Sequence, residues 1–202
     1  EIAAYQIGRT GVAIMELPQS ETYTVEDIYA LPEGQRAELI DGRIYNMAPP
    51  VRVHQHLVMN LSAAIHAYIK AKGGDCLVYP APFAVFLNED DRNYVEPDIS
   101  VICDQGKLDE KGCNGAPDWI IEIVSQSTQQ MDYGIKLFKY RTAGVREYWI
   151  VNPVKRTVMV YDFEHEKKTW QYSFEDIISG CIYEDFSICL AEMIPQKLKN
   201  PE

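Results

Sequence analysis

A glutamate stands in the middle of an almost entirely apolar run, where Glu122 interrupts residues 119–124 with the sequence WIIEIV. The length and the Trp, Ile and Val content of this run are typical of a buried β-strand. A carboxylate inside such a strand loses hydration, which paired charges or a divalent metal ion must replace. The sequence therefore predicts a central strand over residues 118–125 that carries a carboxylate with a chemical role.

A second carboxylate has a similar setting. Asp98 follows Pro97 within residues 95–103, which form another short apolar run and are predicted to be one strand. Acids on neighbouring strands can share one metal ion, and Mg²⁺ is commonly held by one or two carboxylates while it keeps several waters. The backbone carbonyl of Ile123 is a candidate for a further ligand, and Glu96, on the strand face of Asp98, is a spare one. We therefore expect a site for Mg²⁺ or Mn²⁺.

Lys136 offers the cation that metal-dependent hydrolysis often uses. It lies in an amphipathic helix predicted over residues 128–143, where Asp132, Lys136 and Tyr140 recur at i, i+4 and i+8. A helix that directly follows a central strand can return a side chain toward that strand. A lysine there can orient water or stabilise charge that develops on a phosphate. Taken alone, Lys136 is also explained as a solvated residue or as the i+4 partner of Asp132.

The remaining sequence patterns predict helices and strands in mixed order. Asp41-Gly42 between apolar arms predicts a hairpin over residues 37–47. Helices are expected over residues 22–28 and 53–72, and strands over 76–79, 82–87, 145–151, 157–163 and 169–174. This order indicates an α/β fold, or more finely an α+β mixed sheet flanked by helices.

The chain length of 202 residues suits one domain. We expect that domain over residues 21–195, preceded by an N-terminal extension (1–20), for which an expression-derived origin is one explanation, and followed by a C-terminal tail (196–202). No apolar run reaches the roughly 18 residues that span a bilayer, so no membrane partner is expected. We predict a cytoplasmic protein.

The sequence has five cysteines, which is an odd number, and no two of them are spaced as C-x-x-C. This pattern favours reduced thiols over a disulfide framework or a zinc ribbon. Cys76 and Cys103 lie in apolar runs and are expected in the core.

The net charge, 19 basic against 30 acidic residues or −11, argues against a broad basic face for nucleic acid. It leaves room for a local basic cleft, or for a site where metal ions offset the acids. G-x-S-x-G, G-x-G-x-x-G and P-loop patterns are absent from the sequence, which disfavours serine hydrolases and nucleotide-cofactor binding. The four histidines are too sparse for a zinc site.

The two acids on successive strands resemble the PD-(D/E)XK nuclease pattern, although Val124 stands where that pattern has its lysine. Other motifs resemble one family within that superfamily, the Uma-two-like putative restriction endonuclease family. These motifs are, in chain order, Ala37-Glu38-Leu39-Ile40-Asp41-Gly42, Met47-Ala48-Pro49-Pro50, His54, Ala81-Pro82-Phe83, Gly115-Ala116-Pro117-Asp118, Glu122-Ile123-Val124-Ser125, Ser127-Thr128, Asp132, Lys136, Tyr140 and Gly144-Val145-Arg146-Glu147-Tyr148-Trp149. The likeness covers residues 23–193.

The resemblance implies a restriction-endonuclease-like core and a lysine displaced onto the helix after the second acid. By position, Asp98 and Glu122 become the metal ligands, Glu38 an accessory acid and Lys136 the catalytic lysine. His54 matches a family position, which implies a contact to substrate phosphate or water. The implied activity is Mg²⁺- or Mn²⁺-dependent cleavage of DNA by a homodimer, the dimer by analogy.

Two alternatives stay open at this point. The acidic charge and Val124 favour a nucleic-acid-binding or regulatory module that kept a nuclease fold without efficient cleavage. A metal-dependent hydrolase of another phosphate substrate is the second alternative, because it needs no basic groove for DNA.

Overall fold

A computed structural model describes residues 22–88, 90–125, 128–165 and 168–194. The expected extension over residues 1–20 and the tail over 196–202 lie outside these ranges. The main element is a six-stranded sheet in the order β11–β10–β9–β8–β6–β3. Its strands are β3 (Leu77–Pro80), β6 (Ile99–Ile102), β8 (Trp119–Ile123), β9 (Glu147–Asn152), β10 (Thr157–Asp162) and β11 (Thr169–Ser173). The predicted central strand is confirmed, since β8 lies between β9 and β6.

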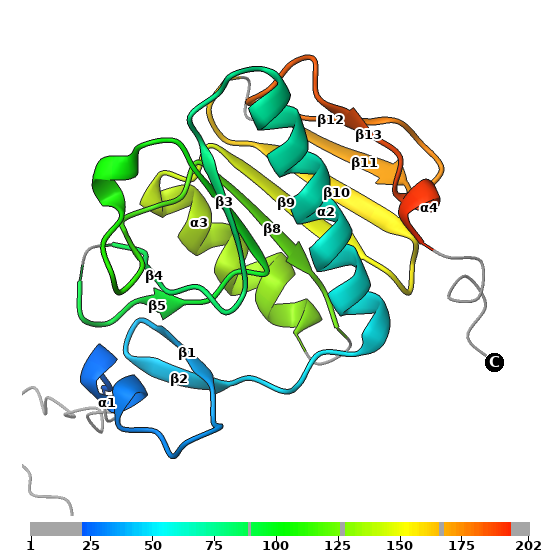
Figure 1. Cartoon of the computed structure of the whole chain (residues 1–202). Coiled ribbons are helices and arrows are strands. Elements are labelled where there is room, and N and C mark those ends of the chain that lie inside the picture. The colour runs from blue at the N-terminus through cyan, green and yellow to red at the C-terminus, as the bar shows by residue number, and fades with distance from the viewer. Residues whose placement is uncertain (1–21, 89, 126–127, 166–167, 195–202) are drawn as a thin grey trace, which may run out of the picture.

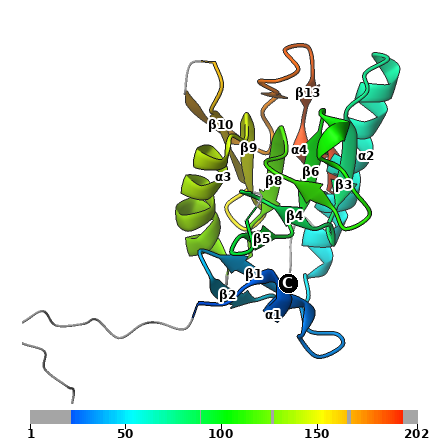
Figure 2. The same ribbon diagram turned by 90° about the vertical axis from the view of Figure 1, so that its left-hand side faces the viewer.

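Helices cover both faces of this sheet (Figures 1 and 2). On one side lies α2 (Arg52–Ala71), and on the other a π-helical turn, η2 (Met131–Lys136), continues into α3 (Leu137–Ala143). Side chains of a strand alternate between faces. Trp119, Ile121 and Ile123 of β8 therefore pack in the cluster that includes α2, and Ile120 packs in the cluster that includes α3. The mixed α/β architecture predicted from the sequence is confirmed.

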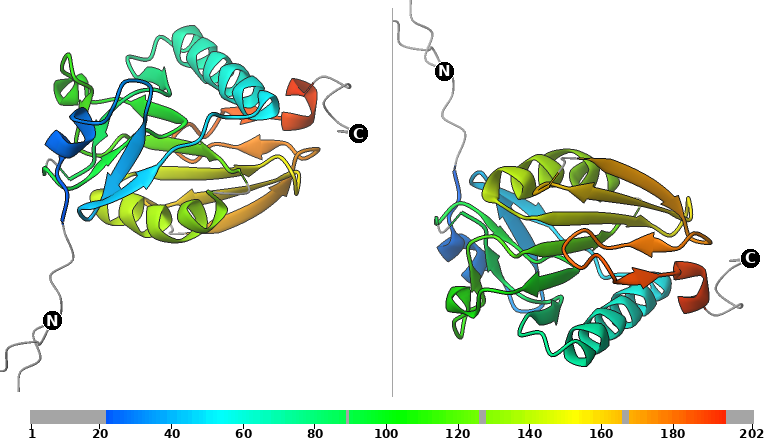
Figure 3. Two further views of the ribbon diagram at one scale, coloured as in Figure 1. Left: turned by 90° about the horizontal axis from the view of Figure 1, so that it is seen from below. Right: turned by 90° about the horizontal axis from the view of Figure 1, so that it is seen from above.

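A second, five-stranded sheet lies at one end of the main sheet, next to α1 (Val25–Tyr29) (Figures 1 and 3). Its strands are β1 (Ala37–Ile40), β2 (Arg43–Asn46), β4 (Val85–Phe86), β5 (Tyr94–Val95) and β7 (Cys113–Asn114). The β1–β2 hairpin turns at Asp41 and Gly42, which have positive φ values of 50° and 73°. This geometry explains why Asp-Gly forms the turn, because few other residues adopt it readily.

The prediction of one strand over residues 95–103 was wrong. The chain leaves β5 of the small sheet at Val95 and enters β6 of the main sheet at Ile99. Pro97 lies in the crossing, and a proline cannot donate a hydrogen bond to continue a ladder. Asp98 consequently sits where the two sheets meet. The strand predicted over residues 82–87 is likewise reduced to the two residues of β4.

The other elements are short. They are η1 (Gln105–Lys107), β12 (Ile178–Ser179), β13 (Ser187–Ile188) and α4 (Leu190–Met193). Phe186 and Leu190 pack into the hydrophobic cluster on the α2 side of the main sheet, so the C-terminal segment closes that layer. In the part of the chain that the structure describes, no helix combines the length and the apolar character needed to cross a bilayer.

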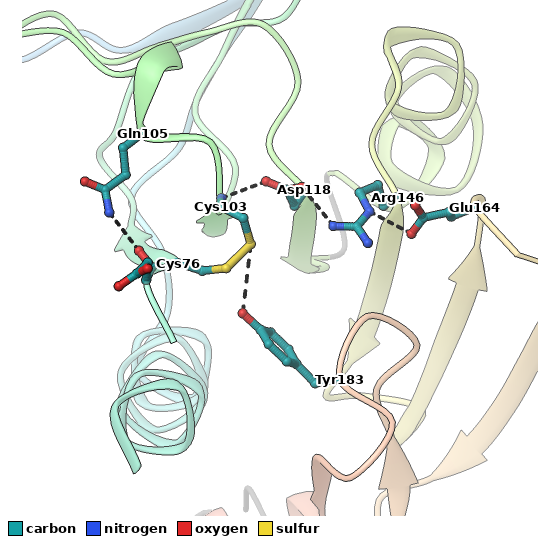
Figure 4. The surroundings of a disulfide bond; sticks show 8 residues. Cys76, Cys103, Gln105, Asp118, Arg146, Glu164 and Tyr183 are labelled. Atoms are coloured by element: carbon teal, nitrogen blue, oxygen red, sulfur yellow. Dashed lines mark hydrogen bonds and ion pairs between the residues drawn. A yellow bond between two sulfur atoms is a disulfide. The ribbon is translucent and has the colours of Figure 1, made fainter. Parts of the chain in front are cut away.

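The expectation of reduced, core cysteines was wrong for one pair. Cys76 and Cys103 form a disulfide and are only half-buried (Figure 4). The antiparallel register pairs Leu77 with Ile102, which places the two cysteines opposite each other one position further along. That register joins residues far apart in the chain and leaves no local signal. Cys113, Cys181 and Cys189 are free thiols.

Candidate active site

Glu122 lies in the middle of the central strand and points to the α3 face of the sheet. Its side chain is almost fully buried, and its Oε1 accepts hydrogen bonds from Lys136 Nζ at 3.0 Å and from the Tyr140 hydroxyl at 2.7 Å. The hydration lost by burial is thus replaced by an ammonium and a hydroxyl. Both partners come from the helical segment that follows the strand.

Lys136 is the centre of the acidic cluster. Its ammonium lies 2.8 Å from Glu38 Oε2, 3.0 Å from Glu122 Oε1 and 3.6 Å from Asp132 Oδ1. Lys136 is only 5% exposed, although lysine is rarely buried. The reading of Lys136 as a solvated surface residue was therefore wrong, whereas its pairing with Asp132 is present as part of a larger cluster.

The helix predicted over residues 128–143 begins with a π turn at Met131–Lys136. A π turn widens the helix by one residue and is frequent at functional sites. Here the turn holds Asp132 and Lys136, and both side chains are buried against the sheet. Tyr140, one α-helical turn further, is also buried. The expected common face of Asp132, Lys136 and Tyr140 is therefore present.

Glu38 brings the small sheet into the cluster. It lies in β1, and its Oε1 accepts the backbone N–H of Glu96 at 3.1 Å. Glu96 was predicted to be a spare metal ligand because it would share a strand face with Asp98. In the structure its carboxylate makes other contacts. The Glu96 carboxylate pairs with Arg36 and accepts the Tyr94 hydroxyl at 2.7 Å. Glu96 therefore helps to hold Glu38 through its backbone.

Asp98 is positioned at the crossing between the sheets. Its Oδ2 accepts the backbone N–H of Ile123 at 2.7 Å and lies 3.0 Å from His54 Nε2. Its own backbone N–H donates to Glu122 Oε2 at 3.3 Å. Asp98 and Glu122 are thus neighbours, and the His54 side chain reaches the site from α2.

The structure places all the site residues expected from the sequence in one connected group. Glu38 and Glu122 meet at Lys136, while Asp98 joins through Glu122 and Ile123. Asp132 and Tyr140 are additional members that the sequence reasoning did not include in the site. Their i, i+4, i+8 spacing around Lys136 was the available signal.

Acids outnumber cations in this group, and the protonation equilibria reflect it. Burial has the largest effect on Glu122 and raises its pKa. Lys136 lowers this pKa and Asp98 raises it, and the result is a pKa of about 8. Burial also raises the pKa of Asp132. Burial lowers the pKa of Lys136, but Glu122, Glu38 and Asp132 outweigh this and hold it well above the usual value. Since several acids share one ammonium, the lysine stays charged and one acid keeps its proton to unusually high pH.

The acids Glu38, Glu122 and Asp132 all contact the ammonium of Lys136. Within residues 22–88, 90–125, 128–165 and 168–194, no three His, Cys, Asp or Glu side chains gather in an arrangement that could hold a metal ion. A metal ion here would have to combine the carboxylates of Asp98 and Glu122, which are linked through the Asp98 backbone N–H, with backbone oxygen and water. Mg²⁺ is often bound in that way, so the oxygen-only donor set fits a hard divalent cation.

Comparisons with known proteins identify the fold and the family of the chain. A crystal structure of a putative nuclease belonging to DUF820, from Anabaena variabilis, superposes with a TM-score of 0.68 at 20% identity, covering 84% of this chain and 96% of that one. Uncharacterized protein slr1290 of Synechocystis sp. is 26% identical over 130 residues, which cover 64% of this chain and 67% of that protein. Residues 25–182 match the Uma2 family, described as "Putative restriction endonuclease". The chain therefore belongs to the Uma2 family of putative restriction endonucleases.

Proposed function

We propose that this protein is a metal-dependent endonuclease that hydrolyses phosphodiester bonds of DNA. The observation that carries the proposal is the 3.0 Å contact between Lys136 Nζ and Glu122 Oε1. Val124 occupies the usual place of the catalytic lysine in the PD-(D/E)XK pattern. Lys136 brings an ammonium to the same acid from the following helix, so the combination of acids and lysine is complete.

In this proposal Asp98 and Glu122 hold Mg²⁺ or Mn²⁺, with the Ile123 carbonyl and water as further ligands, and Glu38 assists. The bound ion supplies charge neutralisation at the phosphate and a more acidic water. Three acids (Glu38, Glu122 and Asp132) contact a single lysine, and Asp98 is linked to Glu122 through its backbone N–H. This excess of acids over cations favours a divalent cation.

Lys136 acts as a fixed positive charge. A lysine whose pKa is held above its usual value does not accept a proton from water near neutral pH. Its role is therefore to orient the attacking water or to stabilise the charge that develops on the phosphate. The carboxylates of Glu38 and Glu122 hold the ammonium in place for that role.

DNA as the substrate rests on the family description and on the relative named a putative nuclease. We also propose a homodimer, since a double-strand cut needs two sites and symmetric dimers are common. A cytoplasmic location is part of the same proposal. The net charge of −11 requires that DNA contacts be local to the site, with the metal offsetting part of the acidic charge.

A binding module without cleavage is the second candidate. The tight burial of Lys136 and Glu122 favours it, because a lysine that neutralises the acids can replace a metal. A hydrolase acting on another phosphate is the third candidate, since the net charge of −11 disfavours a basic groove for DNA and a small substrate needs none.

Plasmid cleavage with Mg²⁺ or Mn²⁺ tests the proposal. The wild type, Asp98→Ala and Lys136→Ala are compared, with Lys139→Ala as the control on the same helix, where Lys139 pairs with the exposed Asp41. We expect cleavage by the wild type and Lys139→Ala, and none by the other two variants. Circular dichroism of each variant tests whether it is folded, so that loss of activity can be separated from loss of structure.

Cleavage that survives Lys136→Ala would remove the role of the lysine while leaving that of the acids. An inert wild type that binds the metal in calorimetry would move the function to another phosphate substrate, to be found in a panel of small phosphodiesters. An inert wild type that binds no metal would favour the binding module.

A further inference from the structure

His54 contacts the candidate active site from α2, a different element from those that carry the acids and the lysine. Its Nε2 lies 3.0 Å from Asp98 Oδ2, and the two side chains are only 12% and 15% exposed. An ionised carboxylate only accepts hydrogen bonds, so the shared hydrogen belongs to His54 Nε2. The contact is thus an N–H···O bond from the ring to the acid.

The Asp98 carboxylate is held at one oxygen. Both the Ile123 N–H, at 2.7 Å, and His54 Nε2 converge on Oδ2. One donor comes from the central strand and the other from α2, so the two together define the orientation of the carboxylate plane. Oδ1 accepts no hydrogen bond from the residues that the structure describes.

We propose that His54 is a positioning residue that orients the Asp98 carboxylate for a divalent metal ion. Hydrogen bonds from neighbouring groups to a metal-binding carboxylate fix its orientation, and losing one typically costs about 10–100-fold in metal affinity or activity. This inference rests on the proposed function, because it assigns His54 a task at the metal site of that function. The contact of His54 to substrate phosphate or water that the resemblance implies stays a prediction.

His54 offers a sharp substitution test because only one of its ring nitrogens makes a contact. Nδ1 is buried and has no hydrogen-bond partner among the described residues. His54→Gln retains an N–H donor at the end of a side chain of similar reach. The substitution removes Nδ1, but this atom makes no hydrogen bond that could be lost. His54→Ala removes the donor altogether.

His56 provides the matched control from the same helix. Its Nε2 bonds to the backbone oxygen of Met193 at 2.9 Å, so it ties α2 to the C-terminal segment. His56→Ala therefore removes a histidine contact of similar length without touching Asp98. Any loss of metal affinity that is due only to a loosened α2 should appear in this control as well.

The experiment is calorimetric titration of Mn²⁺ into the full chain without DNA, followed by plasmid cleavage as a function of Mn²⁺ concentration. We expect His54→Ala to raise the Mn²⁺ dissociation constant about 10–100-fold. His54→Gln should recover most of that loss, and His56→Ala should bind as the wild type does. The half-activating Mn²⁺ concentration should rise with the dissociation constant, while the rate at saturating Mn²⁺ changes less.

Wild-type affinity in His54→Ala would overturn the inference, as would an equal loss in His56→Ala or a failure of His54→Gln to recover binding. A wild type that binds no Mn²⁺ would overturn it too. If the wild type binds Mn²⁺ and the variants behave as expected but no DNA is cut, the positioning role stands and DNA cleavage fails. The two proposals are therefore separable.

Discussion

The ammonium of Lys136 lies 2.8 Å from Glu38, a residue 98 positions earlier in the chain. Glu38 belongs to the small sheet and Lys136 to the helical segment on one face of the main sheet, so this ion pair links two layers of the molecule. Glu122 of the central strand completes the link at 3.0 Å. The acids and the lysine thus hold the architecture together at the same place where the chemistry is proposed.

Removing the lysine should therefore destabilise the fold. Lys136→Met leaves buried acids without their cation, which typically costs about 3–5 kcal/mol. Urea unfolding monitored by circular dichroism measures the change in the free energy of unfolding. Lys139→Met is the control, since Lys139 pairs with the exposed Asp41 and such pairs contribute about 0–1 kcal/mol. Equal losses in the two variants would contradict a central role for Lys136.

The free energy of unfolding should fall as the pH rises from the ordinary pKa of a glutamate to the raised pKa of Glu122. Its pKa is raised from an ordinary value of 4.5 to about 8, mainly by burial, so the folded state binds this proton more tightly than the unfolded state. The stabilising contribution is complete below the unfolded pKa and is lost as pH rises through the folded one. The raised pKa of Asp132 acts in the same sense.

The measurement is urea unfolding between pH 5 and pH 9 in the presence of a chelator. Glu122→Gln should flatten the decline, because Gln does not ionise, whereas Glu26→Gln, at an exposed position of α1, should leave the wild-type slope. A wild-type slope in Glu122→Gln would show that another group governs the pH dependence.

Tyr140→Phe should weaken the cluster without opening a cavity. The Tyr140 hydroxyl donates to Glu122 Oε1 at 2.7 Å, and hydrogen bonds to charged groups contribute about 1.5–3 kcal/mol. Tyr148→Phe removes a hydroxyl that donates to the neutral backbone oxygen of Asp132 at 3.1 Å, for which about 0.5–1.5 kcal/mol is expected. Unfolding at pH 9, where Glu122 is ionised, should separate the variants. Indistinguishable losses would argue against a charged acceptor.

The disulfide between Cys76 and Cys103 fixes the number of free thiols that should be measured before and after reduction. Three of the five cysteines should react with a thiol reagent in denaturant, and all five after reduction. The bond closes a loop with a sequence separation of 27 residues, so reduction should cost about 2–4 kcal/mol of stability. Cys113→Ser, at a free cysteine, provides the comparison for general effects of cysteine loss. Five reactive thiols before reduction would contradict the bond.

Local rules explain which parts of the fold were predictable. The apolar run around Glu122 formed the central strand, and Asp41-Gly42 formed the hairpin turn, because both patterns act over a few neighbouring residues. The 3.6-residue periodicity of the long helix likewise became α2 at Arg52–Ala71. Family resemblance added Glu38 to the candidate site and gave Lys136 its role as the catalytic lysine, and the catalytic roles of both residues stay predictions.

Only the tertiary structure decided how these pieces meet. Pro97 divided one predicted strand between two sheets, and the register of β3 and β6 brought Cys76 and Cys103 together. The π turn at Met131–Lys136 and the approach of His54 to Asp98 were equally invisible in the sequence. The sequence by itself determined the elements and the chemical types of the candidate residues, because these follow from local pattern. Their contacts depend on pairing between distant segments, which no local pattern encodes.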